Sequence, residues 1–186
     1  MSVPSGVRHR DPYAAVVVVG SFGLLLLRVR LATAPDPTRS LLLALVLGAV
    51  LGASLLLPTP AGGSRRFAAV TAAGIGGLAL ASLVTGPRPP VPWAATALPL
   101  SLLAAVAEEA LFRRSLYDRL IARGPVIAVV VSAVAFAALH VPAYGWAVFP
   151  VDLGAGLLFG WQRHAAGTWT APALTHATAN LMAVLR

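Results

Sequence analysis

Long apolar stretches separated by short polar segments make up most of this chain of 186 residues. A membrane-spanning helix needs about 20 mainly apolar residues. Stretches that approach this length cover residues 13–32, 40–57, 67–85, 93–112, 125–141, 144–161 and 168–185. Pro142 separates the fifth from the sixth, and polar residues from Gln162 to Gly167 follow the sixth. The pattern predicts an all-α, polytopic transmembrane helix bundle of about seven spans.

Composition supports an integral membrane protein. The chain is 58% hydrophobic and 11% charged, whereas soluble domains are about 45–50% apolar and about 25% charged. Its formal net charge of +8 therefore suits loops that face the anionic lipid bilayer, and does not indicate nucleic acid. The absence of cysteine excludes disulfides and thiol catalysis. We expect a multi-pass protein of a bacterial or archaeal plasma membrane.

Small residues four positions apart recur within the predicted spans. Gly48 and Gly52 form one such pair, and Gly156 and Gly160 form another. Because glycine lets helix backbones approach closely, both pairs predict tight contacts between neighbouring helices.

Few polar side chains interrupt the spans, and each is a candidate functional residue because burying it in a membrane is costly. They are Glu108, Glu109, His140, Asp152, His176 and Asn180, with Arg113 at the edge of one span. Two adjacent carboxylates in an apolar stretch are the most costly feature, since like charges resist joint ionisation.

Helical spacing assigns separate tasks to the two glutamates. Glu109 and Arg113 are four residues apart and share a helix face. We therefore expect Glu109 to be the structural carboxylate of an ion pair. Glu108 points to a different face and lacks that partner, which leaves it free to act as a base. His176 and Asn180 share a face in the same way.

A longer relation brings Glu108 towards His140. If the helix that carries the glutamates continues to residue 122, Gly124 and Pro125 mark a turn into the next helix. Glu108 and His140 lie equally far along the chain from Gly124. In an antiparallel hairpin they lie at one height, roughly 24 Å from the turn. The spacing therefore predicts a carboxylate beside an imidazole.

Two chemistries suit these side chains. A buried carboxylate beside a histidine can take a proton from water, while His176 and Asn180 can stabilise an oxyanion. Alternatively, Glu108, His140 and His176 offer the two-histidine, one-glutamate ligand set of a catalytic zinc. No H-E-x-x-H helix is present. Asp152 is interpreted as a structural residue or a neighbour of the site, and Phe136 as core.

Three short motifs resemble those of the CPBP intramembrane proteases, the CAAX prenyl endopeptidase and bacteriocin-processing (Abi) family. Residues 108–113, Glu-Glu-Ala-Leu-Phe-Arg, resemble E-E-x-x-x-R. Residues 136–140 resemble F-x-x-x-H, and residues 176–180 resemble H-x-x-x-N. Their order agrees with the family. The apolar pattern gives a polar tail at residues 1–12 and three transmembrane helices at 13–92, and the motifs mark residues 93–186 as the catalytic helical core.

The resemblance implies a CAAX-protease-like fold and a peptidase acting on a peptide or membrane-protein substrate, including lipidated ones. It assigns water activation to Glu108 and His140 and oxyanion stabilisation to His176 and Asn180, with Glu109 and Arg113 completing the site. The family has been described both as metalloproteases and as glutamate proteases, so zinc is a candidate cofactor and none is firmly predicted. A non-catalytic immunity or chaperone-like membrane protein and a proton-coupled transporter are the alternatives.

Overall fold

The computed structural model describes residues 12–31, 37–59, 66–84 and 97–184. Every regular element in these ranges is helical, which confirms the all-α prediction for the part of the chain they cover. The α-helices are α1 (Pro12–Leu31), α2 (Pro37–Leu56), α3 (Phe67–Val84), α4 (Ala97–Glu109), α5 (Tyr117–Leu120), α6 (Pro125–Tyr144), α7 (Phe149–Ala166) and α8 (Thr170–Val184). The predicted polar tail, residues 1–12, lies almost wholly outside the described residues.

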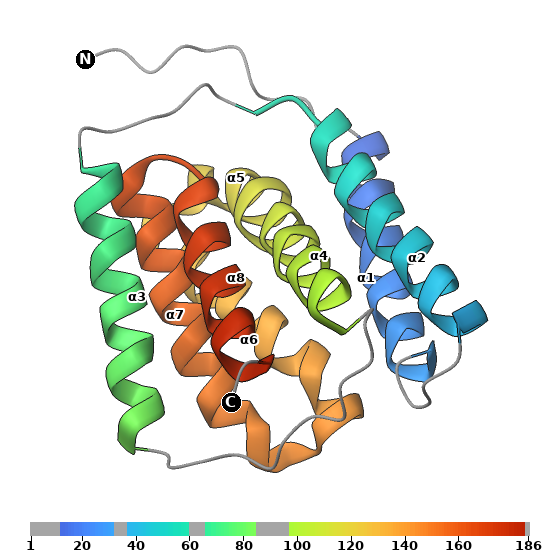
Figure 1. The fold of residues 1–186 in the computed structure, drawn as a ribbon. Coiled ribbons are helices and arrows are strands. Elements are labelled where there is room, and N and C mark those ends of the chain that lie inside the picture. Colours follow the sequence, from blue (N-terminus) through green and yellow to red (C-terminus); the bar gives the residue numbers. More distant parts are fainter. Residues whose placement is uncertain (1–11, 32–36, 60–65, 85–96, 185–186) are drawn as a thin grey trace.

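The helices form a bundle with α4 near its centre (Figure 1). Helices α1 and α2 pair at one side, and α2 also packs against α4. Helix α3 lies at the other side against α7 and α8, while α4 packs on α8 and α6 packs on α7. Large apolar side chains face outward, including Val19 (71% exposed) and Val126 (72% exposed). Such an exterior suits contact with lipid.

Two of the described helices have the length and hydropathy of a membrane span. They are Thr38–Leu56 and Pro125–Tyr144, while Pro12–Arg28 and Phe67–Ala81 are shorter apolar helices. The predicted count of about seven spans is therefore not confirmed. Part of the predicted span at 93–112 lies outside the described residues.

One helical path leads from the two glutamates to the predicted turn. Helix α4 continues into a π-helical segment (Ala110–Leu116), then α5 and a 3₁₀ turn (Ile121–Arg123). Gly124, with φ 112°, follows this turn, and Pro125 occupies the first turn of α6. Proline suits that position because an N–H at a helix start has no intrahelical partner. The predicted hairpin is confirmed, and the π-helical segment within it was not anticipated.

Two of the predicted breaks are wrong. Helix α6 continues through Pro142 and ends before Gly145, whose φ of 79° suits glycine. Helix α7 continues through Gln162 to Ala166. Gln162 is tolerated there because its side-chain nitrogen donates to the Val70 carbonyl and the Thr175 hydroxyl, each at 2.9 Å.

The two glycine pairs differ. A Cβ added at Gly156 would lie 2.9 Å from the Ala133 Cα, and one at Gly160 would lie 2.9 Å from a Val129 methyl. Those glycines let α7 approach α6, as predicted. Gly48 and Gly52 have no atom within 4 Å of such a Cβ among the described residues, so no tight helix contact requires glycine there.

Candidate active site

Glu109 and Arg113 form the expected ion pair, and it is fully buried. An Arg113 guanidinium nitrogen lies 3.1 Å from Glu109 Oε1, and both side chains have zero exposure. Another guanidinium nitrogen of Arg113 donates to the Gly156 carbonyl at 2.9 Å. Arg113 therefore connects the π-helical segment to α7, and π-helical turns often occur at functional sites.

Glu109 also contacts His176, the histidine of the third motif. His176 Nδ1 lies 3.0 Å from Glu109 Oε1. Because an ionised carboxylate only accepts hydrogen bonds, His176 Nδ1 carries the hydrogen of this bond. Arg113, Glu109 and His176 thus form a continuous chain of polar contacts from α7 to α8. Spacing along one helix predicted the first link but not the second.

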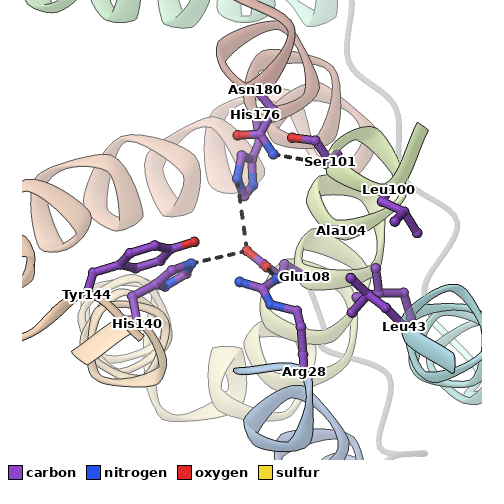
Figure 2. Close-up of a pocket in the computed structure, with 11 residues that line it drawn as sticks. Arg28, Leu43, Leu100, Ser101, Ala104, Glu108, His140, Tyr144, His176 and Asn180 are labelled. Atoms are coloured by element: carbon purple, nitrogen blue, oxygen red, sulfur yellow. Dashed lines mark hydrogen bonds and ion pairs between the residues drawn. The ribbon is translucent and has the colours of Figure 1, made fainter. Parts of the chain in front are cut away.

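Glu108 faces the imidazoles of His140 and His176 through its carboxylate oxygen Oε2 (Figure 2). This atom lies 3.7 Å from His140 Nε2 and 4.0 Å from His176 Nε2. His140 Nδ1 lies 2.9 Å from the Phe136 carbonyl, which can only accept, so Nδ1 carries a hydrogen. A neutral His140 therefore presents an acceptor nitrogen towards Glu108. The predicted proximity of Glu108 and His140 is confirmed.

These groups border a cavity of about 230 Å³. Its lining comes from α1, α2, α4, α6 and α8 and comprises Arg28, Leu43, Leu47, Leu100, Ser101, Ala104, Glu108, His140, Tyr144, His176 and Asn180. Asn180 donates through Nδ2 to the Ser101 carbonyl at 2.9 Å. Four of the six predicted site residues thus line the cavity, while Glu109 and Arg113 lie behind its wall.

The Phe136 ring packs against His140, His176 and the Arg113 guanidinium. Its ring centroid is 4.7 Å from that of His140 and 5.7 Å from that of His176. The Arg113 guanidinium carbon lies 4.8 Å from the Phe136 ring centroid, within range of a cation–π interaction. Phe136 is 3% exposed, so the core assignment holds, and its contacts also restrict both imidazoles. Asp152 is a neighbour of the site, with Oδ2 3.7 Å from His140 Nδ1.

The expectation that Glu108 lacks a cationic partner is wrong. Arg28, near the end of α1, donates to and forms an ion pair with Glu108 Oε1. Arg28 lies within the first predicted span, residues 13–32, and is not among the site residues that the sequence predicts. The apolar run from Val16 to Leu27 contains a single polar residue, Ser21, and gives no sign of which face of α1 packs against the site. Only the packing of α1 reveals the contact between Arg28 and Glu108.

The predicted zinc ligands lie close together without forming a metal site in the described chain. No group of three or more His, Asp or Glu side chains there is placed to hold a metal. Zinc bonds to nitrogen and oxygen are about 2.0–2.2 Å long, and Glu108 Oε1 is already paired with a guanidinium. The arrangement fits an ion pair better than a dication, and zinc stays a candidate cofactor that is not firmly predicted.

Comparison with known proteins identifies the family. The family model described as type II CAAX prenyl endopeptidase Rce1-like matches residues 90–182, half of the chain. No curated protein and no solved structure gives a significant match. The matched region contains all three motifs, whose side chains lie on α4, the π-helical segment, α6 and α8. The chain therefore belongs to the Rce1-like family of type II CAAX prenyl endopeptidases, which are membrane-embedded peptidases.

Proposed function

We propose that this protein hydrolyses a peptide bond near the C-terminus of a lipidated substrate, using water activated by Glu108 and His140. The observation that carries the proposal is the pair of acceptors, Glu108 Oε2 and His140 Nε2, that face each other at 3.7 Å beside a cavity. A water molecule at the cavity edge can donate one hydrogen towards each. A water occupies about 30 Å³ of liquid, so a cavity of about 230 Å³ also admits a peptide carbonyl.

In the proposed reaction, Glu108 takes a proton as the water oxygen attacks the carbonyl carbon. The resulting oxyanion is stabilised by Asn180, whose amide has a second hydrogen besides the one given to Ser101. His176 contributes as its protonated form, which Glu109 supports through Nδ1. The C–N bond then breaks, and the proton held by Glu108 passes to the leaving amine. Hydrogen bonds that strengthen as charge develops are a main source of catalysis.

Glu109 and Arg113 support the reaction indirectly, through their contact with His176. Their fully buried pair fixes the oxygen that holds His176. The proposed site therefore comprises Glu108, His140, His176 and Asn180 at the cavity, supported by Glu109 and Arg113. Family membership supports the reaction class, and the distances around Glu108 support the division of tasks.

Replacing Glu108 with glutamine tests this proposal. We expect Glu108→Gln to abolish cleavage of a farnesylated C-A-A-X peptide by the purified protein in liposomes. The thermal unfolding temperature should fall only modestly, because the glutamine amide oxygen can still accept a hydrogen bond from Arg28. His164→Gln is a matched control, because His164 contacts the Tyr117 hydroxyl, outside the cavity. Full activity of Glu108→Gln would exclude the mechanism. Comparative membrane proteomics of cells that carry the wild-type protein or Glu108→Gln would reveal the native substrate. Metal analysis of the purified protein would test for zinc.

No turnover by the wild-type protein on any peptide, or proton-coupled flux through it, would favour the non-catalytic or transporter alternative. A proton relay has no need of the amide of Asn180. Asn180→Ala should therefore lower cleavage in the proposed peptidase and leave a relay intact.

A further inference from the structure

Helix α1 brings a charge into a cavity whose other charged and titratable lining groups come from the family-matched region. Arg28 lines the cavity and contacts Glu108, whereas Glu108, His140, Tyr144 and His176 all lie within residues 90–182. The Arg28 side chain is 13% exposed and that of Glu108 is 2% exposed. An arginine held this far inside an apolar bundle requires a compensating interaction, because desolvating a guanidinium is costly.

The contact divides the Glu108 carboxylate between two tasks. Arg28 takes Oε1, while Oε2 faces His140 Nε2 at 3.7 Å and His176 Nε2 at 4.0 Å (Figure 2). A carboxylate joined to Cγ by a single rotatable bond has a broad torsional preference. With Oε1 held by Arg28, Oε2 stays directed at the space where water must lie.

Charge balance gives a second reason. Glu108 and Glu109 are adjacent and buried, and within the described residues the ion pair of Arg113 is with Glu109. A second cation is needed for both carboxylates to be charged in a region of low dielectric. Arg28 supplies it at Oε1, whereas the contacts with the two imidazoles are made by Oε2.

We propose that Arg28 is a positioning residue for hydrolysis, which holds Glu108 Oε1 so that Oε2 meets the attacking water. This inference rests on the proposed function of Glu108. It adds a residue from outside the three motifs and makes α1 part of the active site.

Kinetics of two Arg28 variants and a matched control test the proposal. Arg114 is the control, because its guanidinium donates to the Ser54 and Leu55 carbonyls of α2 and makes no contact with Glu108 in the described structure. On the farnesylated peptide, we expect Arg28→Ala to lower kcat by about 10- to 100-fold, the range typical of residues that support a ligand or catalytic side chain, with little change in KM. Arg28→Lys should retain most of kcat, and Arg114→Ala should retain all of it.

Chemical rescue separates positioning from a general effect on folding. Added methylguanidinium should restore part of the kcat of Arg28→Ala, and sodium chloride at equal ionic strength should not. The same additive should leave Arg114→Ala unchanged. The proposal would be overturned if Arg28→Ala lost kcat, methylguanidinium did not restore it, and Arg28→Lys was equally impaired. That result would indicate a purely structural contact.

Three other outcomes would also overturn it. An unchanged kcat in Arg28→Ala means that Glu108 is directed by other groups. A raised kcat means that Arg28 blocks the site, and a raised KM alone means that Arg28 binds the substrate carboxylate. Each of these results, obtained with Glu108→Gln inactive, leaves the proposed function intact. Activity in Glu108→Gln would instead remove the basis of both proposals.

Discussion

Glu109 and Glu108 are neighbours in the chain, and each is paired with an arginine, but the two pairs are built differently. Arg113 lies four residues after Glu109, and both side chains have zero exposure. Arg28 reaches Glu108 from a helix eighty positions earlier, and its side chain borders the cavity. The local pair is placed to support the fold and His176. The long-range pair is placed to act on the carboxylate that faces the proposed reaction.

The largest expected effect comes from breaking the local pair. Arg113→Met leaves Glu109 buried without its cation, and removing one partner of a buried pair costs about 3–5 kcal/mol. It also removes the donor to the Gly156 carbonyl. We expect a large fall in the thermal unfolding temperature in detergent, together with loss of cleavage. Arg28→Met should lower the unfolding temperature less, because its partner borders a cavity. Equal losses would contradict the distinction between the pairs.

Separating α6 from α7 should have the next largest effect. In Gly156→Ala the new Cβ would meet the Ala133 Cα at 2.9 Å, and overpacking typically costs about 1–3 kcal/mol. His140 lies on α6 and the Gly156 carbonyl accepts from Arg113, so cleavage should fall with stability. Gly154→Ala on the same helix has open space around it and should be neutral or slightly stabilising. A loss of stability in Gly154→Ala equal to that in Gly156→Ala would contradict the role of the Ala133 contact, because alanine has the higher helix propensity at both positions.

The sequence could predict the features that depend on local spacing. The contact of Glu109 with Arg113 follows from one helical turn, and the proximity of Glu108 and His140 follows from their equal distance to Gly124. His176 and Asn180 share the cavity because they lie on one face of α8. In each case a continuous helical path converts sequence separation into position, and the π-helical segment after Glu109 does not disturb the two contacts.

The remaining features depend on tertiary packing. Arg28 meets Glu108 only because α1 packs beside α2, α6 and the π-helical segment, and an apolar helix can present any of its faces to a bundle. The π-helical segment is equally hidden, since Ala-Leu-Phe-Arg has ordinary α-helical propensity. Its altered hydrogen bonding coincides with contacts from α7, namely Gly156 with the Arg113 guanidinium and Arg163 with the Arg113 carbonyl. Pro142 failed as a break because a proline within a membrane helix is tolerated when neighbouring groups satisfy the backbone.

The smallest expected effect concerns Arg163 of α7. It tests whether α7 holds Arg113 through the Arg113 backbone carbonyl as well as through the Arg113 side chain. Arg163 Nε donates to the Arg113 carbonyl at 2.9 Å, and a second nitrogen pairs with Asp118 at 2.6 Å. Burial raises the pKa of the Asp118 carboxyl, while the Arg163 guanidinium opposes that shift. Both side chains are slightly exposed, so we expect Arg163→Gln to cost about 1 kcal/mol, near the upper range of exposed ion pairs.

Cleavage by Arg163→Gln should fall a few-fold in kcat, because the Arg113 carbonyl loses its donor while the Arg113–Glu109 pair remains. Asp118→Asn is the informative companion, since it weakens the ion pair and keeps the bond from Nε to the carbonyl. A smaller loss of kcat in Asp118→Asn than in Arg163→Gln would place the effect at the π-helical segment. Equal losses would show that the effect comes from the Arg163–Asp118 ion pair. The Arg113 position would then depend on its contact with the Gly156 carbonyl and not on Arg163.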